Sequence, residues 1–126
     1  MEIKRNNLLG VIQRWGGIHG WKVSFDLTIR SEPSSWAGIL HFTTGDNCCS
    51  LGDRIPFVKL YKDQLVILNA VNGNGNHQEW FTYPLNKKFN ITIEARLKLG
   101  EVNLIFVIHI LSYKQAIFLV LVSNLY

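Results

Sequence analysis

Chemically versatile side chains gather in one short stretch of the sequence, residues 45–54. They are Asp46, Asn47, Cys48, Cys49, Asp53 and Arg54. Apolar, strand-like sequence lies on both sides of this stretch. Strands that hold a polar loop are a common way to present side chains for recognition. We therefore predict a binding loop, in which Asp53 and Arg54 either contact the ligand or, as we favour, form a structural ion pair that holds the loop.

A second polar segment, residues 72–76, has the sequence NGNGN. The two loops together carry six carboxylate or amide side chains, Asp46, Asn47, Asp53, Asn72, Asn74 and Asn76, and Asn69 lies beside the second loop. Calcium prefers such hard ligands, so the loops would form a calcium site if they met at one end of a sheet sandwich. Asp46, Asn47 and Asp53 are then the candidate metal ligands. The alternative, which we favour, is plain turn chemistry, because Asn and Gly tolerate positive φ angles in tight hairpins.

Aromatic side chains offer a second recognition device. The chain has four tryptophans, most of which core packing explains. Trp36 follows a Pro-Ser-Ser turn, whereas Trp80 follows the NGNGN segment and has Tyr83 nearby. Flat rings stack on the apolar faces of sugars, and we expect Trp36 or Trp80 to face a ligand. The predicted ligand-binding set is Trp36, Asp46, Asn47, Asp53, Arg54, Asn72, Asn74, Asn76, Trp80 and Tyr83.

No group of residues in the sequence is typical of catalysis. Glycoside hydrolysis needs two carboxylates roughly 5–9.5 Å apart, but Asp26 and Glu94 stand singly on their predicted strands. No GxSxG elbow is present, and the four histidines show no metal-ligand spacing. We therefore predict a protein that is not an enzyme and has no cofactor, apart from the calcium alternative above.

The two cysteines are adjacent, at 48 and 49. A disulfide normally needs a larger separation of the Cα atoms than one peptide bond allows. We therefore favour two partly buried thiols over an intermolecular disulfide, and the cysteines leave the redox compartment open.

The elements that must position these residues are strands. Apolar residues alternate with polar ones over 23–29 and 89–97, and shorter strands are predicted at 38–44, 56–61, 65–71 and 79–83. Turn-forming sequence separates them. With 126 residues and no convincing helix, the pattern predicts one all-β domain, an antiparallel β-sandwich spanning 1–126.

The segment 102–126 has a different composition, because Lys114 is its only charged residue. Two continuous apolar runs within it indicate a hairpin that turns at 112–115 and lies centrally in the sandwich. The alternative is a membrane helix over 102–122. Lys114 would cost such a helix roughly 2.5–3.5 kcal/mol on insertion, so we favour the hairpin and expect no membrane partner.

The charge distribution also bounds the partners. A net charge of +4 comes from scattered basic residues, whereas nucleic-acid binding needs a basic stripe; we expect no nucleic-acid partner. The first residues show no signal peptide, so the chain is either cytosolic or an internal piece of a longer secreted protein. Asn90-Ile91-Thr92 is a glycosylation acceptor sequence.

Five segments in order, WKVSFDLTIR, WAGILHFTTG, GDRIPFVKLY, QLVILNAVNGNGN and FNITIEARL, together resemble the concanavalin A-like jelly-roll superfamily. The resemblance spans roughly residues 8–100 and is greatest to the laminin G-like and pentraxin-like modules of extracellular and cell-surface animal proteins. It rests on the order and spacing of strands.

The resemblance implies an extracellular, lectin-like module that binds glycans or protein partners, often with calcium at the loop rim. Only Asp46, Asn47 and Asp53 fall in a loop where such modules could hold the ion, and they do not make a full ligand set. Modules of this family usually have further strands beyond the position of residue 126, which suggests a domain incomplete at its C-terminus. An exposed sheet edge would then favour a homo-oligomer.

We therefore predict a non-enzymatic module that recognises carbohydrate or an extracellular protein surface through loops 45–54 and 72–80. The alternative is an assembly module that self-associates through its apolar C-terminal strands.

Overall fold

The computed structural model describes residues 2–4, 7–12, 20–48, 50–71, 74–98, 101–110 and 120–123. These residues form strands and connecting segments and contain no helix. The strands are β1 (Gly20–Thr28), β2 (Ala37–His41), β3 (Phe57–Tyr61), β4 (Gln64–Val71), β5 (Asn74–Thr82), β6 (Lys88–Lys98), β7 (Glu101–Ile110) and β8 (Val120–Ser123). The predicted all-β class is confirmed.

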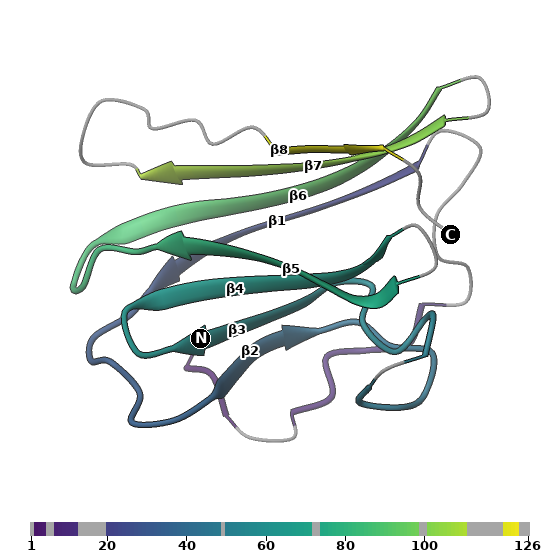
Figure 1. The fold of residues 1–126 in the computed structure, drawn as a ribbon. Coiled ribbons are helices and arrows are strands. Elements are labelled where there is room, and N and C mark those ends of the chain that lie inside the picture. Colours follow the sequence, from purple (N-terminus) through teal and green to yellow (C-terminus); the bar gives the residue numbers. More distant parts are fainter. Residues whose placement is uncertain are drawn as a thin grey trace.

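The strands form two four-stranded antiparallel sheets, in the orders β1-β6-β7-β8 and β2-β3-β4-β5. Figure 1 shows the first sheet above the second, with the strands of each running side by side. The chain passes from the first sheet to the second between β1 and β2, and returns between β5 and β6. Because the first sheet pairs β1 with β6, its assembly brings together segments that are far apart in the sequence.

The core lies between the two sheets and follows from the period-two pattern. Ile91 and Ile93 of β6 contribute to one buried cluster with Val58 and Leu60 of β3, and all four are at most 4% exposed. Alternate side chains of a strand point to opposite faces of its sheet, so one face of each sheet is apolar and packs against the other. Burying such a side chain contributes roughly 1.5–3 kcal/mol. The predicted antiparallel β-sandwich is therefore confirmed.

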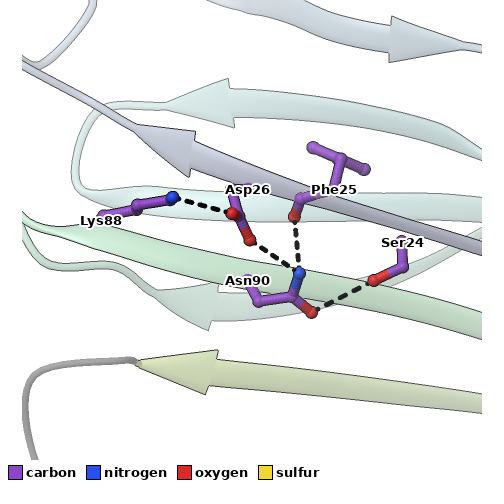
Figure 2. Close-up of polar contacts among 5 residues, drawn as sticks. All are labelled: Ser24, Phe25, Asp26, Lys88 and Asn90. Atoms are coloured by element: carbon purple, nitrogen blue, oxygen red, sulfur yellow. Dashed lines mark hydrogen bonds and ion pairs between the residues drawn. The ribbon is translucent and has the colours of Figure 1, made fainter.

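The outer face of the first sheet carries a polar network instead. Figure 2 shows the side chain of Asn90 between β1 and β6, where its Nδ2 donates to Asp26 Oδ1 (2.9 Å) and to the Phe25 carbonyl (3.2 Å). Its Oδ1 accepts from Ser24 Oγ at 3.3 Å, and Lys88 Nζ lies 3.0 Å from Asp26 Oδ2. The nitrogen of the predicted glycosylation acceptor is thus already hydrogen-bonded to β1. These contacts pin the register of the β1–β6 pair.

The outer face of the second sheet is apolar and forms a second buried cluster. Phe57, Val66 and Leu68 are at most 8% exposed, and Tyr61 packs against them. Phe57 and Tyr61 alternate along β3 with the core residues Val58 and Leu60, which places them on the opposite face. This sheet therefore buries side chains on both faces.

Two sequence-based predictions need correction. The segment 72–76 is not all turn, because β5 begins at Asn74; residues 72 and 73 lie outside the described part of the chain. The predicted C-terminal hairpin is confirmed as an antiparallel pair of β7 and β8, and its turn at 112–115 lies outside the described residues. However, β8 occupies an edge of its sheet and not the centre. Within the described residues, no helix of membrane-spanning length and apolarity occurs.

Candidate functional site

The polar loop between β2 and β3 begins as a continuation of that hairpin. Phe42 N donates to the Pro56 carbonyl (2.9 Å), and Ile55 N donates to the Phe42 carbonyl (3.0 Å). Farther out, Thr44 N donates to Gly52 O at 2.9 Å. Gly52 has a φ of 95°, and a Cβ there would lie 2.7 Å from Thr44 Oγ1, so only glycine fits. Backbone hydrogen bonds therefore continue between the two arms of the loop, beyond the ends of β2 and β3.

Asp53 and Arg54, both predicted to contact a ligand or to pair with each other, are buried at 5% and 7% exposure. Asp53 Oδ2 accepts from Ser50 N at 2.8 Å, and the Asp53 carbonyl lies 2.6 Å from His41 Nε2. Arg54 Nε donates to the Asn47 carbonyl at 2.9 Å. The two side chains therefore hold the loop, as we favoured, but each does so through hydrogen bonds to other groups and not through an ion pair between them.

The two predicted loops meet through one side-chain contact. Arg54 Nη1 donates to Asn76 Oδ1 at the start of β5, across 22 positions of sequence. Asn74 Oδ1 in turn accepts from Asn76 N at 2.9 Å. The structure thus brings Asn47, Arg54, Asn74 and Asn76 to one end of the second sheet. Asn72 lies outside the described residues.

Two of the three candidate calcium ligands, Asn47 and Asp53, already accept hydrogen bonds within this loop. The Asn47 carbonyl accepts from the Arg54 guanidinium, and the Asp53 carboxylate is buried and bonded to Ser50 N. A guanidinium within the candidate ligand set repels a divalent cation. Asp46 is exposed, and its carbonyl accepts from Thr43 Oγ1 at 2.6 Å. Within the described residues, no group of three or more His, Cys, Asp or Glu side chains could hold a metal ion.

The expectation of two partly buried thiols is wrong for Cys48. This residue is disulfide-bonded, and it is exposed in the polar loop. Residue 49 lies outside the described part of the chain. A disulfide was not expected from the sequence because adjacent cysteines have unfavourable geometry for one.

Three aromatic residues, Trp36, Tyr61 and Trp80, meet on the outer face of the second sheet, and we call them the aromatic cluster. The rings of Trp36 and Tyr61 stack with centroids 4.7 Å apart, and Trp80 lies edge-on to Trp36 at 5.6 Å and to Tyr61 at 6.3 Å. Trp36 and Trp80 remain 48% and 45% exposed. Both predicted candidates therefore face solvent, and they do so together.

Strand pairing explains why these residues meet. Trp36 directly precedes β2, which pairs with β3, so it lies opposite the end of β3 where Tyr61 stands. Trp80 pairs with Val66 on β4, and Val66 pairs with Lys59 on β3. Beneath the cluster lies the fully buried Val66. The rings are therefore carried by β3, by β5 and by the residue before β2, and β4 lies between the two strands.

Cationic side chains lie over the aromatic rings along the same face. Lys59 Nζ is 4.4 Å from the centroid of Phe57 and 5.3 Å from that of Trp36. Arg54 Cζ is 5.8 Å from Phe57, and Lys62 Nζ is 5.4 Å from Tyr61. Burial, and then repulsion by Arg54, lower the pKa of Lys59 from its ordinary value. Positively charged side chains and aromatic rings thus lie next to one another on β3 and at its two ends.

Tyr83, the remaining predicted ligand residue, lies elsewhere. It packs against the core cluster between the sheets, and its hydroxyl donates to the Lys62 carbonyl at 2.5 Å. Burial, followed by the charges of Glu32 and Asp63, raises the pKa of its phenol. Tyr83 is therefore not part of the aromatic cluster on the outer face.

Two members of this surface were missed from the sequence, Lys59 and Tyr61. A signal was present, because Phe57, Lys59 and Tyr61 alternate with the apolar pair Val58 and Leu60. That alternation predicts an outward face for the three residues. It does not say that Trp80, two strands away, would lie beside them.

No family model, no curated protein and no solved structure matches this chain.

Proposed function

We propose that this protein is a carbohydrate-binding module whose ligand stacks on the aromatic cluster of Trp36, Tyr61 and Trp80. The observation that carries the proposal is the contact between two half-exposed tryptophans on one sheet face. Sugar rings have apolar C–H faces that pack on flat aromatic side chains, and hydroxyl groups at their edges that stay hydrated or bond to polar neighbours. No catalytic role is part of this proposal.

The packing of the aromatic side chains supports the proposal. Tyr61 packs on the buried outer cluster, which contains Val66 and Leu68, and Trp36 stacks on Tyr61. Side chains held by a packed layer lose little conformational freedom when a ligand binds, so less of the contact energy is spent on ordering them. A surface of this kind favours weak but specific binding of a small flat ligand.

The proposal moves the ligand away from the loops predicted from the sequence. Arg54 and Asn76 bond to each other, and Asp53 is buried in bonds to its own loop. These residues instead hold together the end of the second sheet that lies next to Phe57, and the guanidinium of Arg54 lies over the Phe57 ring. A jelly-roll topology and an extracellular location, as in the laminin G-like modules that the sequence resembles, belong to the same proposal.

The proposal is tested on an array of immobilised neutral and acidic glycans, followed by titration of the intrinsic tryptophan fluorescence with those that bind. Trp80→Ala and Trp36→Ala should abolish binding, while Trp80→Phe should retain part of it because a flat ring remains. Asp46→Ala, in the exposed polar loop, serves as the matched control and should bind normally. Circular dichroism establishes that each variant is folded.

Three results would contradict the proposal. Loss of glycan binding in Asp46→Ala but not in Trp80→Ala would return the ligand to the loop. Absence of binding to every glycan on the array by the folded protein would refute a carbohydrate ligand. A dimer in light scattering that Trp80→Ala converts to a monomer, without glycan binding, would make the aromatic cluster an assembly surface.

A further inference from the structure

Lys59 places a half-buried ammonium group on the outer face of the second sheet. Lys59 lies in the middle of β3, and its Nζ approaches the ring faces of Phe57 and Trp36. The side chain is half-buried, so the ammonium has lost part of its hydration. Cation–π contacts with the ring faces offset part of this desolvation cost, by about 0.5–2 kcal/mol for each well-placed contact.

The charge that acts on Lys59 is another positive one. Arg54 Cζ lies 5.8 Å from the centroid of Phe57, the same ring that Lys59 Nζ approaches, and it lowers the pKa of Lys59 by repulsion, after burial itself. Neither the Lys88–Asp26 ion pair nor the His77–Glu79 ion pair involves Lys59. This half-buried cation is thus surrounded by aromatic rings and a like charge. Such a site favours an anionic group, because an anion there would relieve both the repulsion and the lost hydration.

The aromatic cluster stands directly beside this charge. Lys59 Nζ lies 5.3 Å from the Trp36 centroid, and Trp36 contacts both Tyr61 and Trp80. The three rings contact one another, with centroids 4.7–6.3 Å apart, and Trp80 stands edge-on to the other two. They form one compact cluster and not a row of separate rings. A compact cluster suits one sugar unit, whereas a long polysaccharide would use rings spaced along a groove.

We infer that the sugar unit stacked on the aromatic cluster is an acidic one, whose carboxylate binds the ammonium of Lys59. This inference rests on the proposed function and adds the chemical class of the ligand: a short saccharide with a uronic or sialic acid unit. The aromatic cluster supplies stacking for any sugar, and Lys59 supplies the preference for the charged one. Arg54, which precedes β3, and Lys62, which follows it, add positive charge on either side of Lys59, and this charge attracts an anion to the face.

The test compares pairs of ligands that differ in their acid group. The probes are methyl β-glucuronide with methyl β-glucoside, and sialyllactose with lactose, titrated by tryptophan fluorescence into the folded protein. We expect the acidic member of at least one pair to bind about tenfold more tightly than its neutral partner, the effect of one charge-assisted hydrogen bond. The preference should weaken as salt is added.

Variants assign that preference to one residue. Lys59→Gln should bind both members of the pair equally, whereas Lys59→Arg should keep the preference because the charge remains. Lys22→Gln, exposed on the outer face of the other sheet, is the matched control for net charge and should behave as the unmodified protein. Trp80→Ala should abolish binding of the acidic and the neutral sugar alike.

The outcomes separate this inference from the proposed function. Equal binding of acidic and neutral sugars, lost in Trp80→Ala and unchanged in Lys59→Gln, would overturn the inference and leave the proposed function standing. Binding to polyglutamate as strong as to the acidic sugar would show attraction to any polyanion and overturn it too. Binding to vesicles of anionic phospholipid, lost in Trp80→Ala and without sugar binding, would assign the surface to a membrane and overturn both.

Discussion

Replacing Arg54 by methionine should destabilise the fold more than any change to an exposed charge. Arg54 is 7% exposed, and its guanidinium donates to the Asn47 carbonyl and to Asn76 Oδ1. These two bonds tie the β2–β3 loop to the first residues of β5. Methionine keeps most of the apolar stem that packs near Phe57 but donates no hydrogen bond. The variant therefore isolates the polar contribution.

The expected loss is about 2 kcal/mol of unfolding free energy. A hydrogen bond to a charged group contributes about 1.5–3 kcal/mol, so two bonds at the lower value contribute about 3 kcal/mol, and the contact with the Phe57 ring adds roughly 0.5. However, the variant has no guanidinium to desolvate on folding, and avoiding that cost restores about 1–2 kcal/mol of unfolding free energy. For a domain of this size, the melting temperature should fall by about 6–10 °C.

Urea unfolding followed by circular dichroism measures this loss. Arg30→Met, at an exposed position, is the matched control and should change stability by less than about 0.5 kcal/mol. A double-mutant cycle with Asn76→Ala should give a coupling of about 1 kcal/mol, because the two residues share one bond. If Arg54→Met is no more destabilising than Arg30→Met, or if the cycle shows no coupling, Arg54 does not hold the two loops together.

Three further measurements address other parts of the molecule. The hydrogen bond from Asn90, and then the contact with Lys88, lower the pKa of Asp26 below its ordinary value of 3.8. The stability that the ionised Asp26 contributes is therefore present above pH 3.8 and is lost as the pH falls through the lowered pKa. Asp26→Asn should flatten the acid side of a plot of melting temperature against pH. Ile91→Ala, at 0% exposure in the core, should cost about 2–5 kcal/mol in urea unfolding. Millimolar calcium should leave the melting temperature within about 1 °C of its value in chelator, since a ligand of the native loop 45–54 would raise it.

The sheet architecture was predictable because it depends on local alternation. The runs at 23–29 and 89–97 place apolar side chains on every second residue, and the structure pairs them directly as β1 and β6. Each run needs only one apolar face to join a sandwich. The position of β8 at a sheet edge was not predictable in this way, because a continuously apolar run carries no periodic signal of which neighbours it has.

The site was less predictable because it depends on contacts between distant residues. Asp53 and Arg54 are adjacent and oppositely charged, which suggested a pair, yet Arg54 instead reaches Asn76 on another strand. Sequence order gives no information on which acceptor lies nearest once the loop is folded. Polar loop residues can equally be the hydrogen-bond partners of the loop's own backbone, and here Asp53, Arg54 and Asn74 have that role.

The aromatic cluster shows how a surface forms from residues that no motif connects. Trp36 and Trp80 are separated by most of the second sheet in sequence, and only the chain of pairings β2–β3–β4–β5 brings them together. Gly38 on β2, which pairs with Lys59, leaves little room for a side chain, since a Cβ there would lie 3.2 Å from the Phe57 ring. A larger residue at position 38 would press on Phe57, the ring that the Lys59 ammonium approaches. The outer face is therefore specified by packing as well as by exposure, and packing of this kind is what a surface needs if its rings and charge are to meet a ligand in one fixed geometry.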